Sequence, residues 1–132
     1  MNSPLELAQG LLSRARDDAF VVRRLMADAA VPAWVLGFHA QQAVEKALKA
    51  VLSATGVAYP RTHNLVMLVE LLRATCALPP DADEFGRLTP FGVVMRYEDV
   101  AVDTPPLDAT WLDAIVSRTI EWAQRFLTEN EG

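Results

Sequence analysis

The chain has 132 residues, of which 52% are apolar and 22% charged, a balance that fits one globular domain over residues 1–132 and excludes disordered and fibrous proteins. The net charge of −5 excludes non-specific binding to phosphate backbones, which needs clustered Lys and Arg. Any contact with RNA must therefore be local.

The cellular compartment is predicted from the cysteine content and from the absence of targeting segments. The single cysteine, Cys76, can form no internal disulfide, which fits a reducing compartment. The N-terminal residues lack the apolar core of a signal peptide, and no apolar stretch approaches the roughly 18 residues that a membrane span needs. We therefore expect a cytoplasmic protein without a membrane contact.

The first predicted helix begins at the N-terminus of the chain. Ser3 can cap it, Pro4 suits its first position, and Glu6 can complete a capping box. Apolar residues then recur at the three- and four-residue spacing of a bundle helix: Leu5, Ala8, Leu12, Ala15, Ala19, Val22 and Met26.

This first helix also carries four arginines that could make a local contact with RNA: Arg14, Arg16, Arg23 and Arg24. Arg14 and Arg24 each precede an aspartate by four residues, namely Asp18 and Asp28. That spacing favours a solvated face with local ion pairs.

A second helix is expected to run to about Ala54, where Gly56 ends it. Because a helix advances about 100° per residue, its side chains separate into two faces. One is alanine-rich and suits close packing: Leu36, Ala40, Ala43, Val44, Ala47, Leu48, Ala50 and Val51. The other is polar: His39, Gln41, Gln42, Glu45, Lys46, Lys49 and Ser53. Bulky Trp34, Phe38 and Leu52 project into the polar face, so we expect it to contact another molecule.

A third helix is expected after the connector at Pro60. Thr62 can cap it, and Pro79–Pro80 closes it. Its apolar face comprises Leu65, Leu68, Val69 and Leu72.

The last part of the chain predicts one or two further elements and a final helix. Residues 81–99 predict a short helix followed by an irregular segment or a second short helix, because Pro90 and Gly92 interrupt the pattern. Residues 104–106 open the last helix, whose bundle-spaced residues are Leu112, Ile115, Thr119, Trp122 and Phe126. The chain is therefore expected to form an all-α, up-and-down antiparallel bundle of four to five helices.

Four segments carry a resemblance to a known family: FHAQQAVEKALKAVL at 38–52, THN at 62–64, LTPF at 88–91 and RYED at 96–99. Together they resemble the HEPN domain, the "higher eukaryotes and prokaryotes nucleotide-binding" family, from about Leu5 to Leu127. The resemblance implies a helical bundle that forms a homodimer and is often encoded beside a minimal nucleotidyltransferase. It also implies that many relatives are RNases or toxins.

The family's RNases use an arginine followed, after four to six residues, by a histidine. Neither histidine of this chain fits that motif. Residues 32–34, Pro-Ala-Trp, stand at the matching positions before His39, and residues 56–58, Gly-Val-Ala, stand before His63. The catalytic pair therefore cannot be transferred to this chain, and its catalytic residues stay unknown.

The binding candidates are polar side chains on the second helix and two nearby segments: His39, Gln42, Glu45, Lys46, Lys49, His63, Arg96 and Tyr97. His39 can act as a general base or bind phosphate, because imidazole exchanges a proton near neutral pH. The alternative is a half-buried histidine that is hydrogen-bonded across the bundle. With no metal motif and no glycine-rich phosphate loop, we expect neither a metal nor a cofactor.

Two partners are conceivable for Glu45. It precedes Lys49 by four residues, which predicts an intrahelical ion pair. It could instead take Arg96 as a bidentate partner, which would tie residues 81–99 to the second helix. The other role for Arg96 is ligand or partner binding, whereas Tyr97 is more typical of a core aromatic than of a stacking platform.

Three hypotheses for function follow from these residues and the resemblance. The first is a dimeric interaction module that acts with a separate nucleotidyltransferase chain in a toxin–antitoxin-like system. The second is a metal-independent RNase that uses His39 or His63 with Arg96. The third is a nucleotide-binding module, with Lys46, Lys49 and Arg96 on the phosphates and Tyr97 or Phe38 on the base.

Overall fold

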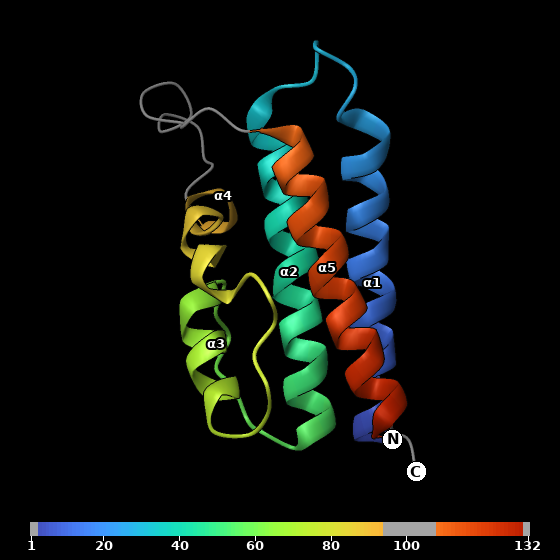
Figure 1. Ribbon diagram of the computed structural model, residues 1–132, viewed down its shortest axis with the longest axis vertical. Coiled ribbons are helices and arrows are strands. Elements are labelled where there is room, and N and C mark those ends of the chain that lie inside the picture. The colour runs from blue at the N-terminus through green and yellow to red at the C-terminus, as the bar shows by residue number, and fades with distance from the viewer. Residues whose placement is uncertain (1–2, 94–107, 131–132) are drawn as a thin grey trace.

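The computed structural model describes residues 3–93 and 108–130. The helices in these ranges are α1 (Pro4–Leu25), α2 (Ala33–Thr55), α3 (Leu65–Arg73), the 3₁₀ helix η1 (Ala82–Arg87), α4 (Thr89–Val93) and α5 (Ala109–Glu129). The three long helices lie side by side, and α1 runs antiparallel to both α2 and α5 (Figure 1). The prediction of an all-α bundle is confirmed.

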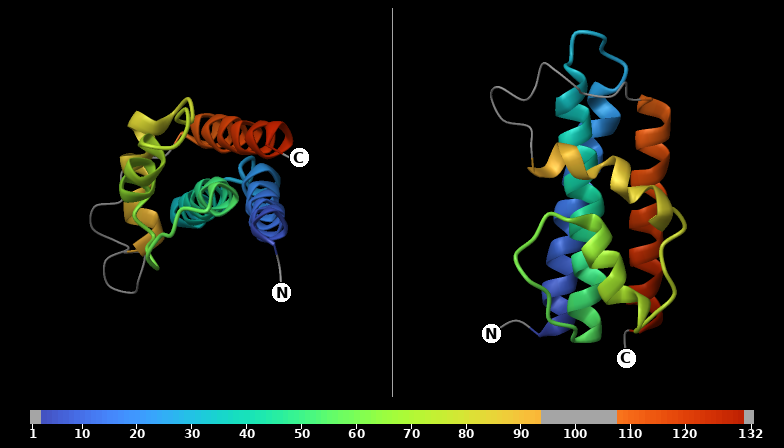
Figure 2. Two further views of the ribbon diagram at one scale, coloured as in Figure 1. Left: turned by 90° about the horizontal axis from the view of Figure 1, so that it is seen from below. Right: turned by 90° about the vertical axis from the view of Figure 1, so that its left-hand side faces the viewer.

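Helix α2 lies at the centre of the molecule. It packs against α1 and α5 on one side and against α3 and α4 on the other (Figure 2). Thirteen of its 23 residues are buried, so it is enclosed on more than its apolar face. The whole predicted alanine-rich face is among them, which confirms that prediction.

The predicted start of α1 and the predicted end of α2 are both confirmed. The Ser3 hydroxyl accepts a hydrogen bond from the Glu6 backbone N–H, and the Glu6 carboxylate accepts one from the Ser3 N–H, each at 3.1 Å. The bond from the Ser3 backbone N–H to the carboxylate, and after it the nearby Ser3 side chain, hold the pKa of Glu6 below its ordinary value. At the end of α2, Gly56 adopts the left-handed conformation with φ 77°, which glycine accepts without strain.

The contact between α2 and α4 requires a glycine. A Cβ placed on Gly37 would lie 2.5 Å from Cδ1 of Phe91, a separation at which the ring must move. Phe91 is itself only 1% exposed. The absence of a side chain at Gly37 therefore lets α4 lie directly on α2.

Two expectations about α3 were wrong, although its apolar face is buried as predicted. The N-cap is Asn64, whose side chain accepts a hydrogen bond from the Met67 N–H, whereas the Thr62 hydroxyl accepts from the Asn64 N–H. The helix ends at Arg73, six residues before Pro79, with Ala74 as its C-cap.

A third correction concerns Leu52, which was expected on a surface that contacts another molecule. Leu52 is fully buried and belongs to the core. The reason is that α3 packs against α2 on this side, so that the far face of α2 is interior. Of the other two apolar residues expected there, Trp34 is 37% exposed and Phe38 is half-buried.

After α3, η1 and α4 follow, so residues 82–93 form two short helices, which is one of the two predicted alternatives; residues 94–99 of the predicted segment lie outside the described residues. Pro90 does not interrupt α4, because it occupies the first turn, where its missing N–H has no helical partner. Helix α5 begins at Ala109 with Asp108 as N-cap. Residues 104–106, which were expected to open it, lie outside the described residues. Of its predicted face, Leu112, Ile115, Thr119 and Trp122 are buried and Phe126 is partly buried.

Candidate functional site

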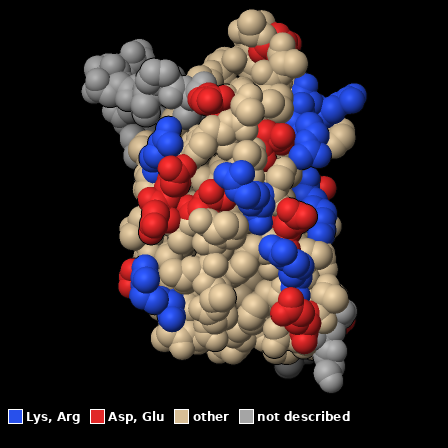
Figure 3. Space-filling view, viewed as in Figure 1, with Lys and Arg blue, Asp and Glu red and all other residues tan. Residues whose placement is uncertain are grey.

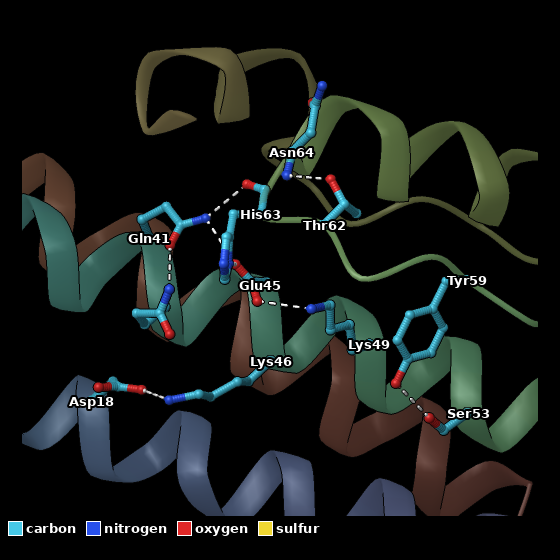
Figure 4. A network of polar contacts seen from close by, with 11 residues as sticks. Asp18, Gln41, Glu45, Lys46, Lys49, Ser53, Tyr59, Thr62, His63 and Asn64 are labelled. Carbon is cyan, nitrogen blue, oxygen red and sulfur yellow. Dashed lines mark hydrogen bonds and ion pairs between the residues drawn. The ribbon is translucent and has the colours of Figure 1, made fainter. Parts of the chain in front are cut away.

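The polar face of α2 forms two hydrogen-bond networks with other parts of the chain (Figure 4). The first joins α2 to α1 through Asp18, whose side chain is 13% exposed. Its Oδ2 accepts a hydrogen bond from Lys46 Nζ at 2.6 Å, and its Oδ1 accepts one from His39 Nδ1 at 2.9 Å. Because a carboxylate only accepts, Nδ1 of His39 carries the proton. His39 is thus a half-buried histidine that is hydrogen-bonded across the bundle.

This first network corrects the expectation of local ion pairs on α1. Asp18 points to α2 and does not pair with Arg14 four residues earlier. Asp28 accepts a hydrogen bond from the Ala30 N–H in the turn after α1. The sequence signal for Asp18 is its place next to Ala15, Ala19 and Val22 on the packed side of the helix.

The second network centres on Glu45, whose side chain is only 5% exposed. Its Oε2 accepts a hydrogen bond from Lys49 Nζ at 2.8 Å, which confirms the predicted intrahelical ion pair. Its Oε1 accepts from His63 Nδ1 at 2.8 Å and from Gln41 Nε2 at 3.1 Å. Both carboxylate oxygens are therefore paired, as a buried charge requires.

Gln41 also belongs to this network, although it was expected on the polar face only and was not among the binding candidates. Gln41 is fully buried, and its Nε2 also donates to the backbone oxygen of His63 at 2.9 Å. Gln42 Nε2 in turn donates to Gln41 Oε1 at 2.8 Å. The available signal was the polar position of Gln41 one turn before Glu45, where an amide can reach the same carboxylate.

Residues 56–64 place His63 against α2. Gly56 turns the chain back, and the Tyr59 hydroxyl lies 3.2 Å from the Ser53 hydroxyl. The Lys49 ammonium lies 5.7 Å from the centre of the Tyr59 ring. The segment therefore contacts α2 at successive turns and closes the polar face that was expected to contact another molecule.

The two histidines differ in access to solvent. Both use Nδ1 for a carboxylate, which leaves Nε2 for other contacts. The His63 side chain is 54% exposed, whereas that of His39 is 29% exposed. His63 is therefore the imidazole that a solute can reach, with the buried Glu45 carboxylate behind it.

The structure thus groups the predicted site residues into two sets: His39 with Lys46 on Asp18, and Lys49 with His63 on Glu45. Arg96 and Tyr97, and with them the expected pair of Arg96 and Glu45, lie outside the described residues. Within residues 3–93 and 108–130, no three His, Cys, Asp or Glu side chains gather as they would around a metal ion.

Three comparisons with known proteins bear on this site. A family model described as the HEPN domain matches residues 8–131, nearly the whole chain. Searches of the curated proteins and of the solved structures found no match. Among the described helices, none combines the length and apolar character needed to cross a membrane.

Proposed function

Because this chain belongs to the HEPN domain family, we propose that it is a dimeric interaction module that acts with a separate minimal nucleotidyltransferase chain in a toxin–antitoxin-like system. The family match supports a nucleotide-binding or RNase-type module. The arrangement of the two histidines favours a role in binding over RNA cleavage.

One observation carries this choice. The Nδ1 atoms of His39 and His63 are both held by carboxylates of the same chain, and each carboxylate is also paired with a lysine. In the part of the chain that the structure describes, neither network contains an arginine. The polar groups of α2 therefore hold helices and segments together, which is what a binding scaffold needs.

Exposed apolar side chains support self-association. Trp34, at the start of α2, is 37% exposed, and Phe38 one turn later is half-buried with its ring edge-on to His39. Adjacent apolar side chains on a small domain are typical of a protein–protein contact. We place the dimer contact at this end of α2.

Co-purification tests the proposed function. The chain, carrying an affinity tag, is expressed together with the reading frames that flank it, and the purified material is identified by mass spectrometry. We expect a nucleotidyltransferase chain to remain bound in a fixed ratio during size-exclusion chromatography. The proposal fails if a flanking nucleotidyltransferase elutes separately, or if neither flanking frame encodes one.

A second candidate function, a metal-independent RNase, is favoured by the geometry at His63. A half-exposed imidazole with a buried carboxylate on Nδ1 is oriented to exchange a proton through Nε2. We expect no cleavage of RNA that depends on either histidine, because the arginine–histidine motif is absent. RNA cleavage that is lost in His63→Ala and in Glu45→Gln, but kept in His39→Ala, would establish the RNase.

A further inference from the structure

A groove of about 360 Å³ lies between α1 and α5, away from the two networks on α2. Its lining combines cationic, apolar and hydroxyl side chains: Arg16, Ala19, Phe20, Arg23, Ser117 and Ile120. The space exists because Ala19 and Ser117 are small and Phe20 points outward. At 63% exposure, Phe20 is the most exposed large apolar side chain in the described part of the chain.

Arginines stand at both ends of this groove. Arg16 Nη2 donates to Gln124 Oε1 at one end. At the other end, Arg23 Nη2 lies 3.0 Å from Ser117 Oγ and 3.3 Å from Asp113 Oδ1. The Arg23 side chain is 65% exposed, so water screens its pair with Asp113. The pair is therefore weak, and Arg23 can exchange it for a pair with another carboxylate.

A third cation lies beside the exposed aromatic ring. The Arg24 guanidinium is 5.5 Å from the centre of the Phe20 ring. In Figure 3, lysine and arginine side chains recur along the side of the molecule where α1 lies, with acidic side chains between them. Arg16, Arg23 and Arg24 are therefore a local group of cations in a chain with a net charge of −5.

We propose that this groove docks an acidic amphipathic helix of a protein partner. Arg16 and Arg23 are seven residues apart on one face of α1, about 10.5 Å along the helix axis. Two carboxylates seven residues apart on a docked helix meet both arginines. An apolar side chain between them fills the space beside Ala19 and Ile120, and the Phe20 ring packs against it.

The charges of the molecule select a protein partner over a nucleic acid. A nucleic acid is a polyanion, and the net charge of −5 on the chain would repel it. A helix with two carboxylates needs only the local pair of Arg16 and Arg23. The groove is formed by α1 and α5 alone, so the inference does not depend on the nucleotidyltransferase partner or on the networks of α2.

Binding of designed peptides to the full chain tests the docking site. The probe is a fluorescent, side-chain-stapled helix with two glutamates seven residues apart and leucines between them, and its matched control has lysines in place of the glutamates. We expect saturable binding of the acidic peptide by fluorescence anisotropy and at least about tenfold weaker binding of the basic one. Equal binding of both peptides, or no binding of the acidic one, would overturn the proposal.

Variants locate the peptide on the groove. Arg16→Glu with Arg23→Glu should weaken binding of the acidic peptide at least about tenfold and improve binding of the basic one, since the charges at both ends are reversed. Phe20→Ser should weaken binding of the acidic peptide, because it removes the apolar contact. Arg73→Glu is the control, because Arg73 is similarly exposed on α3 and pairs with Glu70.

Two further measurements keep the result interpretable. Arg23→Glu places a second carboxylate beside Asp113, so the neutral pair Arg16→Gln and Arg23→Gln is measured too, with circular dichroism to confirm folding. The neutral double variant should weaken binding of the acidic peptide less than the charge-reversed double variant does. If Arg73→Glu weakened binding equally, the peptide would not bind in this groove. If a short single-stranded RNA at equal concentration displaced the peptide, the proposal of a protein partner would be overturned.

Discussion

Glu45 on α2 and Asp18 on α1 show how single carboxylates at the polar face of α2 join separate parts of the chain. Each is a carboxylate with both oxygens in use, one partner being a lysine of α2 and the other a histidine. A buried carboxylate with two charge-assisted bonds is stable only while its partners remain. Glu45 is the more enclosed of the two, at 5% against 13% exposure.

Removing Glu45 should therefore destabilise the fold. Glu45→Ala leaves the enclosed Lys49 ammonium and the Gln41 amide without this acceptor, and we expect the free energy of unfolding to fall by about 2–4 kcal/mol. Glu45→Gln keeps an acceptor oxygen and should cost less. Urea unfolding followed by circular dichroism measures both.

The matched control for Glu45 is Glu70 on α3, which also pairs with a basic residue, Arg73, but is 60% exposed. Glu70→Ala should change the free energy of unfolding by no more than about 0.5 kcal/mol. Equal effects of Glu45→Ala and Glu70→Ala would show that the Glu45 network does not stabilise the fold.

At the scale of elements, the bundle depends on how closely its helices approach α2. Alanines on one side of α2 and Gly37 on the other replace the larger side chains that would hold neighbouring helices away. The contact with α4 is the tightest case, because the Phe91 ring occupies the space above Gly37. Packing at this point therefore fixes where α4 lies.

The variant Gly37→Ala tests that contact. A glycine-to-alanine change within a helix ordinarily stabilises it by up to about 1 kcal/mol. Here the added methyl group meets a buried ring, and we expect a net loss of about 1–3 kcal/mol in the free energy of unfolding.

Gly10 in α1 provides the control for Gly37. A Cβ added at Gly10 meets no atom within 4 Å, so Gly10→Ala should stabilise the protein by about 0.5–1 kcal/mol. Thermal unfolding compares the two variants directly. A stabilised Gly37→Ala protein would mean that Phe91 moves away without cost and that α4 is not fixed by this contact.

The whole molecule has three surfaces of different character. The polar face of α2 is closed by Asp18 and by residues 56–64, so it holds the bundle together. The start of α2 carries the exposed Trp34 and the half-buried Phe38, which we assign to self-association. The groove between α1 and α5 combines arginines with an apolar floor, which we assign to a different protein partner.

Self-association should depend on the start of α2. A charge at Phe38, as in Phe38→Glu, or at Trp34, as in Trp34→Glu, should shift the protein toward the monomer because it would be desolvated in the dimer contact. Multi-angle light scattering over a range of concentrations measures the mass. Leu7→Glu is the control, since Leu7 is 48% exposed on α1.

The outcome of that measurement bears on the proposed dimer in two ways. A wild-type mass that stays that of a monomer at every concentration would contradict the dimer itself. Dissociation by Leu7→Glu, with Phe38→Glu unaffected, would keep the dimer and move its contact to another part of the surface.

The sequence by itself determined those features that depend on residues close together in the chain. The capping box at Ser3, the end of α2 at Gly56 and the apolar faces of the helices follow from spacing and local hydrogen bonds. The ion pair of Glu45 and Lys49 is also local, one helical turn apart. The family resemblance, carried by short motifs, is likewise readable without a structure and is confirmed.

The tertiary structure alone decided which residues meet across the bundle. Helical spacing places Asp18 and Leu52 on a face but does not say which element covers that face, so the partners of Asp18 and the burial of Leu52 were missed. His63 reaches Glu45 only because residues 56–64 fold back along α2, over a separation of 18 residues. Contacts of that range depend on how the whole chain packs, and no local pattern of residues encodes them.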